Sequence, residues 1–189
     1  MNTRYEMRFT GSGGQGVILA SVILAEAAVC DGKQAIQSQS YGPEARGGLC
    51  KAEAIVSKEQ IWFSKVRTPN MLLALNQGSL DKYAPDIADD AIVIIDSSLT
   101  PPDYLDPERL VAIPIIKTAD EKVGKVMTAN IVAVGAINKL LGLFSEEALK
   151  EGIKRHIPAG TEKINHLARV EGEALITDEM AEKFKQAID

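Results

Sequence analysis

Six residues near the amino terminus, Gly11-Ser12-Gly13-Gly14-Gln15-Gly16, restrict the fold of this chain more than any other stretch. Four of the six are glycine, the residue that tolerates positive φ and a close approach of other groups to the backbone. Residues 5–10 before them alternate apolar and polar, which is typical of a strand. Residues 17–29 after them are rich in Ala, Val and Leu and lead to Asp31-Gly32, which suits a helix with a glycine cap. The pattern predicts a strand, a tight turn and a helix.

This turn suits three roles. The first N–H groups of a helix are unpaired and its dipole is positive there, so the turn can meet an anion or a carboxylate of a partner. Gly11, Gly13 and Gly16 also fit the G-x-G-x-x-G pattern of dinucleotide-binding folds. Those folds place an acidic residue about 20 residues further on, whereas residues 33–39 contain none. A nucleotide redox cofactor and a purely structural turn stay open as alternatives. The favoured interpretation is an anion or partner contact through Gly11, Gly13, Gly14, Gln15 and Gly16.

A second unusual stretch covers residues 39–48. Pro43 fixes its own φ and keeps the residue before it out of the helical region, while Gly47-Gly48 leave the end of the loop free. Arg46 offers a permanently charged, bidentate contact to phosphate or carboxylate. A plain surface loop with an internal ion pair is the alternative. Because loops of this kind often carry function, we predict contacts with a partner through Tyr41, Gly42, Pro43, Glu44, Arg46 and Gly47.

Strand patterns continue through the first two-thirds of the chain. Residues 49–56 alternate, and a polar turn joins them to residues 61–63, so we expect a hairpin that makes the sheet mixed. Further strands are predicted at 71–75, 91–95 and 110–115. The unbroken Ile/Val pattern of 91–95 is typical of a strand covered on both faces.

From Thr118 onward the pattern is helical. Residues 128–142 are apolar on most sides and end at a glycine, which predicts a buried helix. Ser145 and Thr161 are candidate N-caps of two more helices. Residues 177–189 are predicted to form a charged helical tail.

These elements predict a three-layer α/β/α fold with a mostly parallel, mixed sheet and a helical C-terminal region. A length of 189 residues suits a single domain over 1–189. In such folds ligands and partners meet the carboxyl ends of the strands. Asn76-Gln77 and Asp96-Ser97 follow strands, as the glycine turn does. We therefore expect them on one rim, with Asn76 and Gln77 as further partner contacts.

Composition excludes several functions. The net charge is −5 and the chain has no Lys/Arg-rich block, so nucleic-acid binding through phosphate neutralisation is not expected. The apolar run 17–29 is too short to span a bilayer and contains Glu26. The amino terminus lacks the apolar core of a signal peptide. We expect a cytoplasmic protein without membrane insertion.

Chemistry-bearing residues are scarce. The two cysteines, Cys30 and Cys50, cannot supply a four-cysteine cluster or a structural zinc site, and we expect them to be buried small hydrophobes and no metal site. His156 and His166 lie in polar helical segments and are expected to be solvated or locally bonded. G-x-S-x-G, H-E-x-x-H and Walker patterns are absent. We therefore predict no catalytic residue, and a module that holds part of a cofactor or docks on a catalytic subunit.

Five blocks of the sequence together resemble the gamma subunit of 2-oxoacid:ferredoxin oxidoreductases. They occur in the order and spacing of that family and extend over roughly residues 5 to 170. The blocks are residues 9–17, 40–48, 74–77, 93–98 and 130–135. The form of residues 40–48, Ser-Tyr-Gly-Pro-Glu-Ala-Arg-Gly-Gly, looks more like the 2-oxoglutarate branch than the pyruvate branch.

The resemblance implies a subunit of a cytoplasmic heterotetramer of anaerobic metabolism. That enzyme decarboxylates 2-oxoglutarate oxidatively with coenzyme A and gives succinyl-CoA, CO2 and reduced ferredoxin or another reduced acceptor. In the family, thiamine diphosphate and Mg²⁺ lie between the alpha and beta subunits, and iron–sulfur clusters belong to beta or delta. The gamma subunit lies near the coenzyme A and thiamine region without supplying the chemistry.

Two alternatives to this interpretation stay open. One is the gamma subunit of a pyruvate or branched-chain 2-oxoacid enzyme, since substrate choice is expected to reside in alpha and beta. The other is a non-catalytic regulatory module or a nucleotide-binding Rossmann-like module, which also predicts a lack of catalytic groups.

Overall fold

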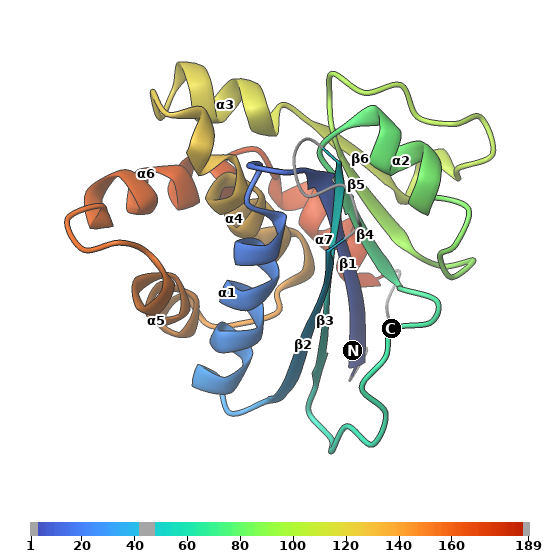
Figure 1. The fold of residues 1–189 in the computed structure, drawn as a ribbon, viewed down its shortest axis with the longest axis horizontal. Coiled ribbons are helices and arrows are strands. Elements are labelled where there is room, and N and C mark those ends of the chain that lie inside the picture. The colour runs from blue at the N-terminus through green and yellow to red at the C-terminus, as the bar shows by residue number, and fades with distance from the viewer. Residues whose placement is uncertain (1–3, 42–47, 187–189) are drawn as a thin grey trace.

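Six strands form one sheet in the order β2-β3-β1-β4-β5-β6 (Figure 1). The computed structural model describes residues 4–41 and 48–186. Strand β3 runs antiparallel to both of its neighbours, β1 and β2, whereas β1, β4, β5 and β6 are parallel. The mostly parallel, mixed sheet is therefore confirmed. The strands are β1 (Arg4–Ser12), β2 (Gln34–Tyr41), β3 (Leu49–Ser57), β4 (Met71–Ala74), β5 (Ile92–Asp96) and β6 (Leu110–Ile113).

Helices cover the two faces unequally, as Figure 1 shows. Six of the described α-helices lie on one side and a single short helix, α2, covers the other. The α-helices are α1 (Val17–Cys30), α2 (Gln77–Tyr83), α3 (Ile115–Glu121), α4 (Ala129–Leu141), α5 (Glu146–His156), α6 (Glu162–Glu173) and α7 (Asp178–Gln186). Two 3-10 turns are η1 (Pro107–Arg109) and η2 (Val126–Thr128). The predicted three-layer α/β/α class and the predicted helical C-terminal region are therefore confirmed.

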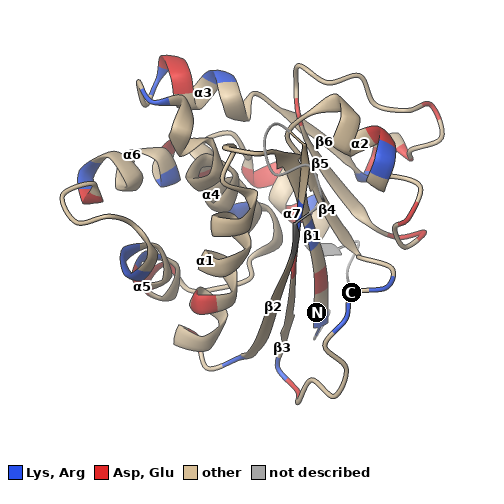
Figure 2. Ribbon diagram, in the orientation of Figure 1, with Lys and Arg blue, Asp and Glu red and all other residues tan. Residues whose placement is uncertain are grey.

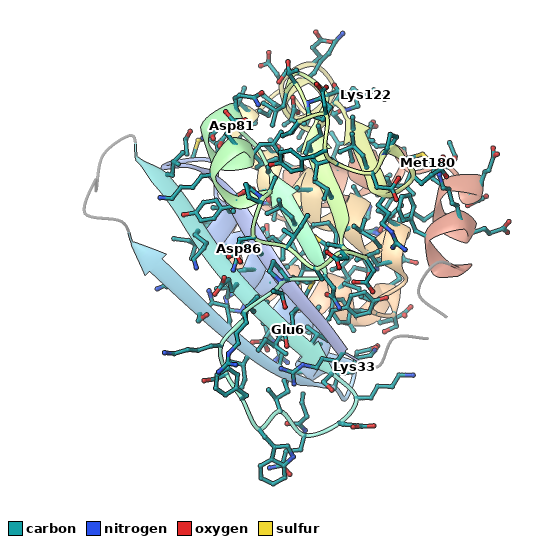
Figure 3. All side chains as sticks on the ribbon, turned by 90° about the vertical axis from the view of Figure 1, so that its right-hand side faces the viewer. Glu6, Lys33, Asp81, Asp86, Lys122 and Met180 are labelled. Carbon is teal, nitrogen blue, oxygen red and sulfur yellow. The ribbon has the colours of Figure 1, made fainter. Side chains whose placement is uncertain are left out.

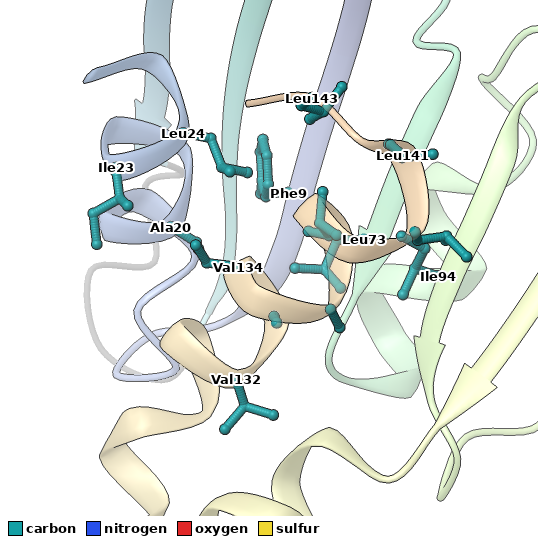
Figure 4. Packing of buried hydrophobic residues seen from close by; sticks show 14 of the residues in the cluster. Phe9, Ala20, Ile23, Leu24, Leu73, Ile94, Val132, Val134, Leu141 and Leu143 are labelled. Atoms are coloured by element: carbon teal, nitrogen blue, oxygen red, sulfur yellow. The ribbon is translucent and has the colours of Figure 1, made fainter. Parts of the chain in front are cut away.

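Each face of the sheet has its own hydrophobic core. The larger core lies under α1 and α4, where Figure 4 shows Phe9, Leu24, Leu73 and Val134 close together. The smaller core lies under α2 and contains Leu72, Leu80, Val93 and Leu105. Alternate side chains of β4 and β5 thus enter opposite cores, so both strands are buried on both faces.

Helix α6 packs directly against α4 through two glycines. A Cβ on Gly135 would collide with the carbonyl oxygen of Arg169, and a Cβ on Gly172 would collide with the carbonyl oxygen of Val132. Only glycine permits this approach of two backbones. The helical region is therefore a close-packed second layer over the sheet, and it holds the start of α4 at the level of the glycine turn.

A buried ion-pair cluster holds the α2 side of the sheet. Arg8 is 2% exposed and donates to Glu53 Oε1 at 2.8 Å and to Asp86 Oδ2 at 2.9 Å. Figure 3 labels Asp86 on the segment that crosses β1 and β3. Because Arg8 bonds both to Glu53 of β3 and to Asp86 after α2, the cluster attaches the segment after α2 to the sheet.

Two expectations about the strands are wrong. Residues 61–63 form no strand, because both edges of β3 are already paired, one with β1 and the other with β2. The hairpin of the structure is β2–β3. Strand β6 ends at Ile113, since Pro114 takes the N-cap position of α3 and the chain turns into the helix there.

Most helix ends match the sequence. Gly142 caps α4 with φ +60°, and Ser145 Oγ accepts from the N–H of Ala148 at 3.3 Å. Thr161 does precede α6, but its hydroxyl donates to the carbonyl of Pro158 instead of capping the helix. No helix in the described part of the chain is long and apolar enough to cross a membrane.

The cysteines and histidines lie at or beyond the margin of the core. Cys30 and Cys50 are free and pack against the core as expected of small hydrophobes, but they are half-buried and not buried. Both lie at an end of their element, where the core gives way to solvent. His156 Nε2 lies 3.4 Å from Glu26 Oε2, and His166 is exposed. The expectation of locally bonded or solvated histidines is confirmed.

Candidate functional site

The glycine turn connects β1 to α1 at the carboxyl end of the sheet. Strand β1 ends at Ser12, α1 begins at Val17, and the turn between them contains two residues in the left-handed region. These are Gly14 with φ +94° and Gly16 with φ +72°. Side chains rarely adopt such φ values, so the chain direction at this corner requires glycine. The predicted strand, turn and helix are confirmed.

The glycines of the turn have different surroundings. A Cβ on Gly11 would lie 2.6 Å from Gln15 Oε1, and a Cβ on Gly16 would lie 2.7 Å from Asn130 Nδ2. These two glycines make room for side chains of the protein itself. Gly13 and Gly14 are exposed, and a Cβ on Gly14 would have no neighbour within 4 Å. The outward edge of the turn is therefore Gly13-Gly14.

Gln15 braces the turn. Its Oε1 accepts from the backbone N–H of Ser12 at 2.6 Å, and its Nε2 donates to the carbonyl of Leu75 at 3.0 Å. The amide thereby joins the end of β1 to the end of β4. Both ends of the amide thus form hydrogen bonds within the protein, which fixes the orientation of the Gln15 side chain.

Asn76 adjoins the turn, and Gln77 does not. Asn76 Oδ1 accepts from the N–H of Ser79 at 2.7 Å and caps α2, while Asn76 Nδ2 donates to Ser12 Oγ. Gln77 instead donates to the carbonyl of Thr100 at 2.9 Å and accepts from its N–H at 2.9 Å. Of the two residues predicted to meet a partner, only Asn76 is bonded to the glycine turn.

The second motif stretch ends beside the glycine turn and begins one strand further away. In the register of the sheet, Cys50 pairs with Gly11 on one side and with Tyr41 on the other. Gly13 N–H donates to the carbonyl of Gly48 at 3.3 Å. Strand pairing thus brings the end of the second stretch to the glycine turn and its start to the next strand but one, an arrangement that the sequence alone did not indicate. The side chain of Tyr41 and the predicted contact residues Gly42, Pro43, Glu44, Arg46 and Gly47 lie outside the described residues.

Asp96 closes the turn after β5. It is 2% exposed and accepts from Ser98 N at 3.0 Å, from Ser98 Oγ at 2.5 Å and from the N–H of Ile116 at 2.8 Å. Three donors from its own protein satisfy this carboxylate. Asp96 therefore shapes the rim and is not displayed on it.

Asn130 is a site residue that the sequence reasoning missed. It lies in the first turn of α4 and is 4% exposed. Its side chain packs against Gly16, where a Cβ would collide with it. Its Oδ1 accepts from the N–H of Ile131 at 3.0 Å. An amide in the first turn of an otherwise apolar helix was the signal, because a buried amide needs a bonding role.

The rim is suited to an anion. Helix α1 has no acidic residue in its first turn, and its first N–H groups have no acceptor among the described residues. Unpaired N–H groups and the helix dipole give this corner a partial positive charge. The described residues contain no group of three or more His, Cys, Asp or Glu that could hold a metal ion. The positive end of α1 is the chemical feature of this rim, and no metal-binding cluster lies beside it among residues 4–41 and 48–186.

The fold defines the class of protein as a three-layer α/β/α module with a glycine turn at the carboxyl end of its sheet. Residues 6–172 match the family described as pyruvate ferredoxin/flavodoxin oxidoreductase, and the chain belongs to this family. The resemblance to 2-oxoacid:ferredoxin oxidoreductases is confirmed.

The chain is also similar over most of its length to individual subunits of such enzymes. The 2-oxoglutarate synthase subunit KorC of Methanocaldococcus jannaschii is 43% identical over 173 residues, which are 89% of this chain and 92% of KorC. A solved gamma subunit of a keto/oxoacid ferredoxin oxidoreductase from Geobacter sulfurreducens is 42% identical, with a TM-score of 0.78 over 91% of this chain and 95% of that one. The ketoisovalerate oxidoreductase subunit VorA of Methanothermobacter thermautotrophicus is 38% identical over 84% of this chain, which is only 33% of VorA.

Proposed function

We propose that this chain is the gamma subunit of a 2-oxoglutarate:ferredoxin oxidoreductase. The assembled enzyme converts 2-oxoglutarate and coenzyme A to succinyl-CoA and CO2 and passes two electrons to ferredoxin or another acceptor. The observation that carries the proposal is the similarity to KorC, which covers nine-tenths of both chains. A match of this extent leaves little of either chain without a counterpart.

In this proposal the glycine turn faces the coenzyme A side of the enzyme. Coenzyme A is a polyanion, and the exposed edge at Gly13-Gly14, followed by the unpaired N–H groups of α1, suits one of its phosphates. Arg46 is the proposed charged partner, because its stretch ends at Gly48, whose carbonyl accepts from the N–H of Gly13 in the turn. The contribution of this chain is to bind and orient, through Gly11, Gly13, Gly14, Gln15, Gly16 and Arg46.

The redox chemistry belongs to other subunits. Iron–sulfur clusters need several thiolates, and this chain has only two cysteines, at the end of α1 and the start of β3. Thiamine diphosphate, Mg²⁺ and the clusters are therefore assigned to alpha, beta and delta subunits of a cytoplasmic complex. Tyr41, Gly42, Pro43, Glu44, Gly47, Asn76 and Gln77 are the proposed contacts of this chain with them.

A branched-chain 2-oxoacid enzyme is the second candidate. VorA, a ketoisovalerate oxidoreductase subunit, is 38% identical to this chain. The glycine rim does not contact the reacting carbon in this proposal, so it fits either acid. Only the identity of the other subunits separates the two candidates.

The test is to purify the tagged chain anaerobically from its native cell and to assay coenzyme A-dependent viologen reduction. We expect thiamine-bearing and cluster-bearing subunits in the eluate and activity with 2-oxoglutarate. Activity with pyruvate or 2-oxoisovalerate alone would keep the family and overturn the substrate. A chain that elutes alone and without activity would contradict the proposal and leave a regulatory or nucleotide-binding module as the explanation.

A further inference from the structure

The loop between β3 and β4, residues 58–70, carries an exposed tryptophan. It extends beyond the sheet at the end opposite the glycine turn (Figures 1 and 3). Trp62 is 85% exposed and its neighbour Phe63 is 46% exposed. Trp62 is the most exposed of the large hydrophobic residues in the described part of the chain. Tryptophan is rare at such exposure on an isolated surface and frequent at the centre of protein interfaces.

Both ends of the loop are fixed to the fold. At its start, the N–H of Glu59 donates to Ser57 Oγ at 3.0 Å. At its end, Asn70 Oδ1 accepts from the N–H of Glu6 at 2.9 Å and Asn70 Nδ2 donates to the carbonyl of Arg4 at 3.2 Å. Val66 is buried between these points. These attachments shorten the free part of the loop, which lowers the entropy that Trp62 loses on binding.

The loop that carries the two aromatic rings is rich in cations. Residues 58–70 contain three bases and one acid in a chain whose net charge is −5, and Figure 2 shows this basic colouring on the loop. Arg67 stacks over the ring of Phe63 with 4.8 Å between guanidinium carbon and ring centroid. Lys58, Lys65 and Arg67 are exposed and form no ion pair with any described residue. An apolar centre with a positive rim fits an acidic protein surface that has a pocket for an indole.

The loop also lies where the ends of the domain lie. Arg4, the first described residue, donates to the carbonyl of Phe63 at 3.5 Å. In α7, the last helix, Lys183 pairs with Glu108 at 2.6 Å, just before β6 begins. The loop therefore lies beside the start of β1, at the amino end of the parallel strands.

We infer that residues 58–70 dock on an acidic surface of another subunit of the same oxidoreductase, with Trp62 as the anchor. Lys58, Lys65 and Arg67 provide the positive rim. This inference rests on the proposed function, because it assumes that the chain is a subunit. Docking here leaves the glycine turn free, since the two features lie at opposite ends of the strands.

The experiment uses the tagged chain co-expressed with its genomic partner subunits. Trp62→Ala is expected to weaken retention of the partners at least 10-fold, measured as the concentration for half-maximal assembly. Lys65→Glu is expected to weaken it several-fold, and less so at high salt. Leu167→Ala and Lys163→Glu on α6 are the matched controls, since they remove another exposed hydrophobic side chain and reverse another exposed charge. Both controls are expected to assemble as the wild type does.

Each outcome separates the two proposals. Trp62 is so exposed that its loss leaves the isolated chain folded, which circular dichroism checks. If the wild type assembles and Trp62→Ala and Lys65→Glu assemble equally well, this inference is wrong and the proposed function stands. If Trp62→Ala changes only the self-association of the isolated chain, the loop meets a second copy and the inference is likewise overturned. If the wild type binds no thiamine-bearing subunit, the proposed function itself fails.

Discussion

The two ends of the sheet present opposite recognition surfaces. At the carboxyl end, the side chains of Gln15, Asn76 and Asn130 bond within the rim, and what faces outward is backbone. At the amino end, the loop of residues 58–70 is attached at its two ends, and exposed side chains face outward. The glycine turn therefore depends on the absence of side chains, whereas the tryptophan loop depends on their presence. Adding a side chain is therefore expected to disrupt the glycine turn, and removing one is expected to disrupt the tryptophan loop.

The largest effect is expected from adding a methyl group at Gly16. Gly16→Ala places a Cβ 2.7 Å from Asn130 Nδ2 at a φ of +72°, so we expect a loss of about 2–4 kcal/mol in the free energy of unfolding. Gly14→Ala is the control, because it has the same kind of φ and no neighbour, and about 1 kcal/mol is expected. Urea unfolding measures both. Equal losses would mean that the close contact with Asn130 contributes nothing.

Removing the brace of the turn should have a smaller effect. Gln15→Ala leaves the N–H of Ser12 and the carbonyl of Leu75 without their partners, and about 1–2 kcal/mol is expected. Gln77→Ala also removes two bonds to backbone, but on an exposed site, where water replaces them at a cost of about 0.5 kcal/mol or less. The comparison is made by thermal and urea unfolding of the purified chain. A larger loss at Gln77 would contradict the bracing role of Gln15.

Glu26, in the C-terminal half of α1, forms a pH-dependent contact with α5 that is expected to stabilise the fold less than the bonds of Gln15 do. A hydrogen bond from Arg155, with a second from His156, holds the pKa of Glu26 below its ordinary value of 4.5. A carboxylate with a lowered pKa stabilises the fold above its unfolded pKa, and this contribution disappears as the pH falls through the lower folded pKa. Glu26→Gln should therefore cost less than about 1 kcal/mol at pH 7 and nothing in strong acid. Unfolding curves at pH 7 and pH 3 test this, and a pH-independent difference would contradict it.

The smallest effect on stability is expected at the tryptophan loop. Trp62→Ala removes a side chain that is 85% exposed, so the free energy of unfolding should stay within about 0.5 kcal/mol of the wild type. The same variant is expected to lose partner binding. A large loss of stability would show that Trp62 is part of the fold, and it would remove the contrast between the two ends of the sheet.

Local sequence patterns predicted most helices, turns and strands correctly, but they did not predict which strands pair with one another. The turn at residues 11–16, the glycine cap at Gly142 and the N-cap at Ser145 follow from backbone requirements of single residues, which a sequence displays directly. Pairing of β3 with β1 and β2 depends on competition between strands that are distant in sequence. The false strand at 61–63 has the right composition, but β3 has no free edge for it.

The site shows the same limit. Gln15 and Asn76 were correctly placed near the turn, yet their bonds to Leu75 and Ser12 follow only from the packing of β4 beside β1. Arg8 occupies the polar position of an alternating strand, and its burial results from the segment after α2 that covers it. Sequence reasoning finds residues that a backbone conformation demands. It misses those that become important only through a neighbour from elsewhere in the chain.

The most direct test of the central claim is an add-back titration. The partner subunits are expressed without this chain, and the purified chain is then added while coenzyme A-dependent viologen reduction is followed with 2-oxoglutarate. The account predicts that activity rises in proportion to the added chain and saturates at a fixed ratio to the partners. Full activity without the chain, or no rise on its addition to partners that bind it, would contradict the claim that it is a working subunit of the oxidoreductase.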